Sequence, residues 1–263
     1  MEIRKLATIS ILILVSLMTS CSKGKLEEKG FRVTSSSESN EIEQEDGLHR
    51  DSLKFETRPS SVLLTGVSNV RLTTIYKVNF NKKTKTTFIG SNSFHHNYRY
   101  EDSETGNNWH NNLMPGIEAV YGYNMVNVSH YDIKENRQKY LFEKPVLIRT
   151  LYYPTFSKDT LNRQPVNREY FIVSVYNEDT NKDGFINPKD LRRIYLFNIK
   201  GEKQQALVPE NYSVIKSEYD SDNDFMYVFA QLDSNENGQR DEVEPIHVFW
   251  INLKDPNKTG RLY

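Results

Sequence analysis

Short apolar runs rich in Tyr, Phe, Val and Ile recur along the chain, and Asn, Asp, Gly or Lys soon interrupts each of them. β-Branched and aromatic residues are favoured in strands, and the interrupting residues are those favoured in tight turns. No stretch longer than about ten residues keeps the 3.6-residue apolar spacing with which a helix buries one face. The pattern therefore predicts an all-β domain of antiparallel hairpins.

Four segments of the chain share one layout: an apolar strand, an Asn or Asp near its end, a polar turn and a second short strand. The aligned residues are Asn79, Asp132, Asn198 and Asn252. Further strand pairs complete two four-stranded units, at residues 146–208 and 212–263. Four antiparallel strands repeated in this way are typical of β-propeller blades, so we expect a propeller-like repeat. A large β-sandwich, in which hairpins resemble one another for local reasons, is the alternative.

Residues 179–190, "DTNKDGFINPKD", carry oxygen-bearing residues at positions 1, 3, 5, 7, 9 and 12, the ligand positions of a twelve-residue calcium loop. The candidate ligands are Asp179, Asn181, Asp183, Phe185 through its backbone carbonyl, Asn187 and Asp190. Gly184 stands at position 6, where the loop turns sharply. Because Asp is shorter than the usual Glu at position 12, we expect weaker Ca²⁺ binding and more competition from Mg²⁺ here.

Residues 233–244, "DSNENGQRDEVE", repeat this spacing in the next unit, with Gly238 at position 6. The candidate ligands are Asp233, Asn235, Asn237, Gln239 through its backbone carbonyl, Asp241 and Glu244. Each loop is expected between the second and third strands of its unit. The alternative for both loops is a solvated hairpin turn, which also favours Asp, Asn and Gly.

Both stretches resemble EF-hand calcium-binding loops. Only Leu191, Arg192 and Arg193 separate the first loop from the next expected strand, so no full helix fits there. The resemblance is to the EF-hand-like loops of dockerins and calcium-loaded propellers rather than to a helix pair. It implies structural calcium, which neutralises the carboxylates and fixes a hairpin loop, and not a switch that opens a groove.

The N-terminus has a basic start and an apolar stretch at 6–18 that is too short for a comfortable membrane span. The sequence that follows, Met-Thr-Ser-Cys at 18–21, resembles the lipobox of bacterial lipoproteins, with Met where Leu is usual. The resemblance implies that residues 1–20 are a signal peptide and that Cys21, the only cysteine, is lipidated. The expected location is the bacterial cell envelope, at the outer membrane, facing the periplasm or the surface.

Residues 21–50 are rich in Ser, Glu and Lys and poor in apolar residues, which predicts a flexible tether. The remaining residues, 51–263, are enough for one β-repeat domain with its own core, and this domain contains both loops.

No G-x-S-x-G elbow, phosphate loop or HExxH motif occurs, and His95, His96 and His110 match no metal-ligand spacing, so no catalytic residue is assigned. The balance of 34 basic and 35 acidic residues, without a basic stripe, argues against nucleic-acid binding. The first hypothesis is a non-enzymatic, lipid-anchored calcium-binding module or scaffold whose partner is an envelope protein or a glycan. The alternative is a calcium-dependent propeller hydrolase, with its ion held by residues from several blades.

Overall fold

The computed structural model describes residues 29–33, 55–94 and 114–263, and these residues form nineteen β-strands and no helix. The chain divides into two compact units, residues 1–28 with 79–88 and residues 29–78 with 89–263. Of the smaller unit the structure describes Asn79–Phe88, the tip of a hairpin formed by β3 (Val70–Asn81) and β4 (Thr86–Ile89). The remaining elements belong to the larger unit.

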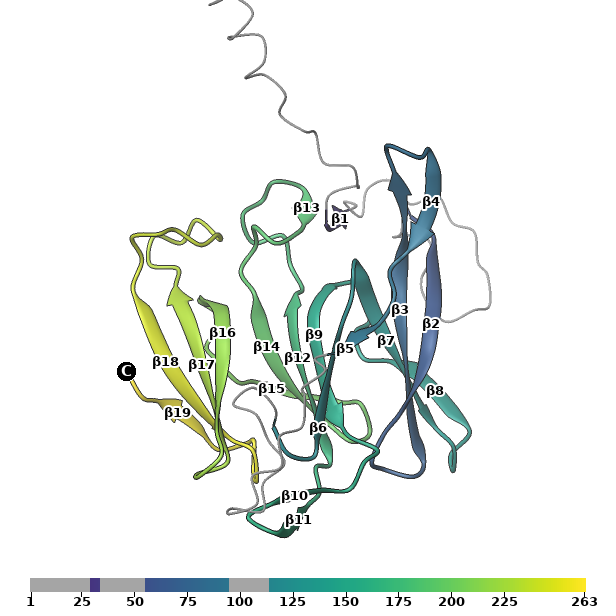
Figure 1. The fold of residues 1–263 in the computed structure, drawn as a ribbon. Coiled ribbons are helices and arrows are strands. Elements are labelled where there is room, and N and C mark those ends of the chain that lie inside the picture. Colours follow the sequence, from purple (N-terminus) through teal and green to yellow (C-terminus); the bar gives the residue numbers. More distant parts are fainter. Residues whose placement is uncertain (1–28, 34–54, 95–113) are drawn as a thin grey trace, which may run out of the picture. The chain divides into compact units, whose positions relative to one another are not determined.

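The larger unit contains three stacked layers of antiparallel strands (Figure 1). The first layer has the order β2-β3-β7-β8, in which β2 is Thr57–Leu64, β7 is Met125–Asp132 and β8 is Arg137–Tyr140. The second has the order β9-β12-β14-β15, with β9 (Leu147–Pro154), β12 (Tyr170–Tyr176), β14 (Arg193–Asn198) and β15 (Lys203–Ala206). The third is a separate sheet of β16 (Tyr212–Asp220), β17 (Phe225–Leu232), β18 (Ile246–Asn252) and β19 (Thr259–Arg261).

Four short pairings complete the described strands. β6 (Ile117–Tyr121) extends the second layer beside β9, and β5 (Ser93–Phe94) pairs with β6. The hairpin of β10 (Asp159–Leu161) and β11 (Gln164–Val166) stands alone, and β1 (Phe31–Arg32) pairs with β13 (Phe185–Ile186). The first two layers are one eleven-stranded sheet, joined through the pairing of Met125 with Ile148. None of the described sheets closes into a barrel.

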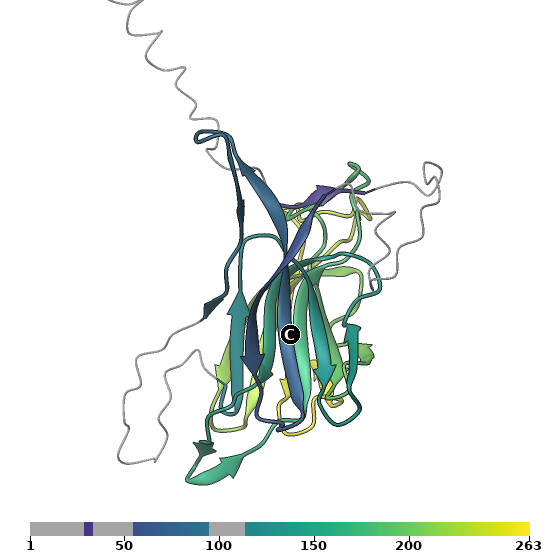
Figure 2. The ribbon, with the colours of Figure 1, turned by 90° about the vertical axis from the view of Figure 1, so that its right-hand side faces the viewer.

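The central strands β12 and β14 of the middle layer are buried on both faces, and this explains why they are nearly continuous apolar runs. Side chains of β12 alternate between two cores: Phe171 and Val173 face the first layer, whereas Ile172 faces the third. β14 does the same, with Phe197 on one face and Leu196 on the other. A strand covered on both faces cannot alternate apolar with polar residues, so "YFIVSVY" and "RIYLFN" follow from the stacking. Figure 2 views the layers face-on, with their strands running in a similar direction.

The recurring Asn or Asp of the sequence pattern opens the hairpin turns. Asp132 Oδ1 accepts hydrogen bonds from Lys134 N and Glu135 N, at 2.8 and 3.1 Å, and Asn198 Oδ1 accepts from Lys200 N and Glu202 N. These are Asx turns, in which a side chain substitutes for a backbone acceptor. In the first segment Asn81, two residues after the aligned Asn79, accepts from Lys83 N and Thr84 N in this way. The repeat is therefore in part a repeated local turn.

The structure confirms the predicted all-β class and antiparallel pairing. It also places four antiparallel strands side by side in each of the units 146–208 and 212–263, β9-β12-β14-β15 in the first and β16-β17-β18-β19 in the second. The predicted tether, 21–50, differs from the structure at residues 29–33, where β1 forms because Phe31 is buried in an apolar cluster with Ile186 and Val126.

Candidate metal-binding loops

Both candidate loops lie between the strands where the sequence analysis expects them. Residues 179–190 lie between β12 and β14, and residues 233–244 lie between β17 and β18. The first loop contains the two-residue strand β13 and a single turn at Pro188, and the described structure has no helix in either loop. Both loops therefore join the second and third strands of a four-stranded layer, which is the connection that the sequence predicts.

The first half of each loop is folded around its Asp at position 1. Asp179 Oδ1 and Oδ2 accept hydrogen bonds from Asp183 N and Gly184 N, at 3.0 and 2.8 Å. Asp233 accepts from Asn237 N and Gly238 N at 3.1 and 3.0 Å. The side chains at positions 3 and 5 accept from amides two residues ahead in both loops, as Asn181 and Asn235 do at position 3. The two sequences thus adopt one local geometry.

The backbone dihedrals repeat as well. Lys182 and Glu236, at position 4, have φ of 58° and 57°, and Gly184 and Gly238, at position 6, have φ of 84° and 74°. These left-handed conformations are readily adopted by glycine and rarely by other residues. Position 6 therefore needs glycine, as an EF-hand-type loop does.

The carboxylate at position 12 closes each loop through the same three amides. Asp190 accepts from the amides of positions 2, 3 and 9, with its shortest contact, 2.7 Å, to Asn187 N. Glu244 accepts from the corresponding amides, and its shortest contact is 2.8 Å to Ser234 N. Asp and Glu therefore satisfy the same donors although their side chains differ by one methylene.

These closing carboxylates are buried without a basic partner. Asp190 is 1% exposed and Glu244 is 7% exposed, and no Lys or Arg of the described residues forms a salt bridge with either. Burial raises the pKa of the Asp190 carboxyl, against the opposing effect of its amide donors, and the nearby charge of Asp179 raises it further. A buried carboxylate without a cation is unfavourable, so each loop has a place where a positive charge would be stabilising.

The donor set of each loop suits a hard cation, because it consists of carboxylate, amide and backbone carbonyl oxygens. In the described residues, however, no three His, Cys, Asp or Glu side chains converge on one point as metal ligands. The carboxylates instead contact amide NH₂ groups: Asn187 donates to Asp183 at 3.3 Å, and Asn235 and Asn237 both donate to Asp241. The ligand types fit Ca²⁺, and binding would require these amides to turn their oxygens inward.

The two loops also touch each other. Thr180 Oγ1 donates to Gly238 O at 2.5 Å, and Asp190 pairs with Gln239 in an isolated antiparallel bridge. A Cβ at Gly238 would lie 1.9 Å from Thr180 O, so no larger residue fits without movement. Position 12 of the first loop is thus linked through backbone to position 7 of the second.

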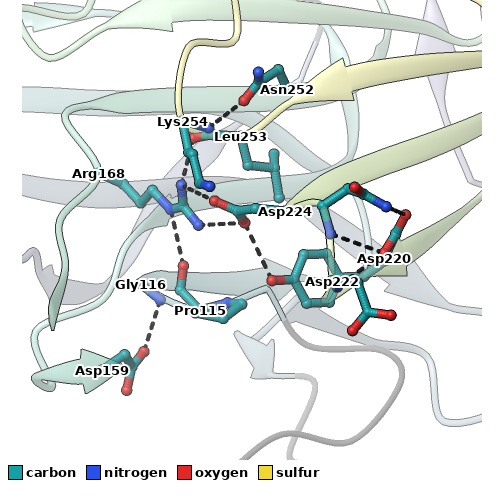
Figure 3. Close-up of polar contacts among 12 residues, drawn as sticks. Pro115, Gly116, Asp159, Arg168, Asp220, Asp222, Asp224, Asn252, Leu253 and Lys254 are labelled. Carbon is teal, nitrogen blue, oxygen red and sulfur yellow. Dashed lines mark hydrogen bonds and ion pairs between the residues drawn. The ribbon is translucent and has the colours of Figure 1, made fainter. Parts of the chain in front are cut away.

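Arg168 and Asp224 form a buried ion pair that the sequence did not indicate (Figure 3). Both side chains are 2% exposed, and two parallel hydrogen bonds of 3.0 and 2.8 Å join them. Arg168 also donates to Pro115 O and to Leu253 O, and Tyr219 donates to Asp224. Asp224 belongs to the acidic segment "YDSDNDF", which is the turn between β16 and β17. Its charge is therefore matched by an arginine.

The N-terminal predictions fall outside the described residues. These are the signal peptide at 1–20, the lipidation site Cys21 and most of the tether. His95, His96 and His110 are also outside them. Within the described part of the chain, no helix is both long and apolar enough to cross a membrane.

Comparison with known proteins gives little further information. No protein-family model matches the chain, and no curated protein matches it significantly in sequence. Among solved structures it is similar to Porphyromonas gingivalis dipeptidyl peptidase 4, with 11% sequence identity and a TM-score of 0.21. The match covers 77% of this chain and 38% of that chain, so the chain spans well under half the length of the peptidase. A similarity at this TM-score assigns neither a fold family nor an activity.

Proposed function

We propose that the protein is a non-enzymatic, calcium-binding module of the bacterial cell envelope, in which Ca²⁺ is structural. One observation carries this proposal: both loops close on a buried position-12 carboxylate that has the same three amide donors and no basic partner among the described residues. A hairpin turn needs no such buried charge, whereas a calcium loop does. The ligands are those of the two loops, Asp179 to Asp190 and Asp233 to Glu244. Mg²⁺ competes best at the first loop, where Asp190 is the shorter residue.

The stacked layers support a propeller-like interpretation of the fold. Each layer is built on four antiparallel strands that pair side by side. In the second layer, β9-β12-β14-β15, and the third, β16-β17-β18-β19, the order in the sheet follows the order in the chain. In this interpretation the calcium loops join the second and third strands of neighbouring blade-like units. The same layers stacked as a sandwich are the alternative.

We further propose that lipid at Cys21 attaches the protein to the membrane, and that the β domain binds an envelope protein or a glycan. The candidate metal ligands come from two contiguous loops, whereas the alternative, a calcium-dependent hydrolase, needs an ion held by residues from several layers. This arrangement favours a binding or scaffold role.

Isothermal titration of the calcium-depleted full chain tests the metal proposal. We expect two Ca²⁺ per chain, one in Asp179→Ala or Asp233→Ala, and none in the double variant. Asp222→Ala, an exposed acidic residue of another turn, is the matched control and should keep both sites. The absence of saturable binding would refute calcium binding.

Membrane fractionation tests the attachment proposal separately. We expect the unsubstituted chain in the membrane fraction and Cys21→Ser in the soluble fraction. If the Cys21→Ser protein remains with the membrane, attachment through this residue is wrong.

A further inference from the structure

An N-terminal segment lies against the first loop, and we call residues 29–33 the N-terminal strap. Phe31 pairs with Ile186 and Arg32 with Phe185, and Val33 N donates to Gly184 O at 2.9 Å (Figure 1). The strap therefore contacts positions 6, 7 and 8 of the loop through its backbone. About 150 residues of chain separate these partners, so the contact is not part of a local hairpin.

Two residues fix the strap in place. Gly30 N donates to Asn124 Oδ1 at 2.8 Å, and Gly30 has φ of 114°, a conformation that favours glycine. A Cβ on Gly30 would lie 2.3 Å from Ile186 O and 2.8 Å from the Cβ of Asn187, the position-9 residue. Phe31 is 7% exposed, and its ring lies 4.9 Å from that of Phe55. The strap is thus packed on the half of the loop that carries ligand positions 7 and 9.

We infer that Ca²⁺ at the first loop and the N-terminal strap stabilise each other, so that calcium fastens this segment to the domain. The inference rests on the calcium binding proposed above. The ion would hold the Phe185 carbonyl and the Asn187 side chain, and the strap holds the backbone of Phe185 and Ile186. Whichever binds first orders this part of the loop, so the second meets a smaller entropic penalty. The hydrogen bond from Val33 N goes to Gly184 O, one residue before the ligand carbonyl.

The second loop has no such segment among the described residues. Its position-7 residue, Gln239, pairs with Asp190 of the first loop instead. A change in the strap should therefore alter calcium affinity at the first loop far more than at the second. Coupling between two ligands is reciprocal: the factor by which calcium strengthens strap attachment is the factor by which the strap strengthens calcium binding. Typical couplings are about 5- to 150-fold.

Amide hydrogen exchange of the unsubstituted full chain gives the first test. We expect the peptide containing Arg32 and Val33 to exchange at least about five-fold more slowly with saturating Ca²⁺ than with EDTA. Calcium stoichiometry is measured on the same sample. Equal exchange with and without Ca²⁺, in a protein that binds two ions, would overturn the inference and leave the proposed function intact. If no Ca²⁺ binds, the proposed function itself fails, and the inference fails with it.

A variant gives the reciprocal test. Gly30→Val replaces no candidate ligand, and its side chain would collide with Ile186 O and Asn187 unless the strap moved away from the loop. Arg32→Ala changes an exposed side chain of the same strap while keeping its backbone. Both are made in a Glu244→Gln background, in which the second loop is disabled, so that titration reports the first loop. We expect Gly30→Val to weaken Ca²⁺ binding at least about five-fold and Arg32→Ala to change it little. Unchanged affinity in a folded Gly30→Val protein would overturn the inference.

Discussion

Gly184 and Gly238 occupy the same position in two matching loops but are constrained differently. A Cβ at Gly184 would meet no atom within 4 Å, so only its positive φ opposes substitution. At Gly238 the Cβ would also collide with Thr180 O. We expect Gly184→Ala to lower the free energy of unfolding by about 1–2 kcal/mol, and Gly238→Ala to lower it by distinctly more. Urea denaturation of both variants measures the difference. Equal losses of unfolding free energy would mean that the loop–loop contact can rearrange at no energetic cost.

We expect the buried imidazole of His130 to make the stability of the fold depend on pH. It is 3% exposed in β7, and its Nε2 lies 2.9 Å from Ile199 O. Burial lowers the pKa of the imidazole from its ordinary value of 6.5, more than the Ile199 contact raises it. The folded state favours the neutral ring, so the contribution of this ring to the free energy of unfolding is fully present above pH 6.5. That contribution is lost as the pH falls through 6.5 towards the folded pKa.

We therefore expect the unsubstituted chain to lose more unfolding free energy than His130→Gln between about pH 7 and pH 5.5. Gln keeps an N–H donor for Ile199 O and does not titrate. Urea denaturation at several pH values gives the comparison. Parallel pH profiles for the two proteins would contradict the assigned role of the ring.

At the scale of elements, the second and third layers are joined at both ends of their strands. Arg168 precedes β12 and Asp224 precedes β17, whereas the two loops follow the ends of these strands. The ion pair therefore connects one end of the two layers, and the contact between Thr180 and Gly238 connects the other. This double connection fixes the two loops relative to each other.

Removing one charge of the buried pair should be strongly destabilising. Asp224→Asn keeps the shape and tolerates the left-handed backbone of this position but leaves Arg168 without its counter-charge. We expect a loss of about 3–5 kcal/mol in unfolding free energy, measured by urea denaturation. Asp222→Asn, in the same turn and exposed, should change stability by less than about 0.5 kcal/mol. Similar effects of the two substitutions would show that the pair is not a strong connection.

The sequence predicted the features that depend on neighbouring residues. Short apolar runs rich in β-branched and aromatic residues indicated the strands, and the spacing of Asp179 to Asp190 indicated a loop whose internal hydrogen bonds the structure shows. The strap and the ion pair depend on which distant segments meet. Gly30 and Arg168 stand in polar surroundings of the sequence, and nothing local indicates that Phe31 packs on Ile186 or that Arg168 reaches Asp224. Such long-range contacts required the structure.

For the whole molecule, calcium should raise the melting temperature. A ligand present at a hundred-fold excess over its Kd adds about 2.7 kcal/mol per site, which for a domain of this size is a rise of about 5–10 °C for each site and about twice that for both. We expect EDTA to remove the rise, Asp179→Ala and Asp233→Ala each to remove about half, and the double variant to show none. The full chain is needed, because a protein that starts at residue 45 lacks the strap. A melting temperature that EDTA does not change would mean that the loops are hairpin turns that bind no Ca²⁺.

The strap also sets how far the domain can travel from its point of attachment. If Cys21 carries the lipid, eight residues lead from it to Lys29, and at full extension they span about 28 Å. Without the strap contact, the chain from Cys21 to Phe55 has 34 residues, and a chain of that length can span at most about 120 Å. Calcium would then limit the distance between the domain and the membrane. The calcium-loaded protein would be held with its loops close to the bilayer surface, and the depleted protein could lie several times farther from it.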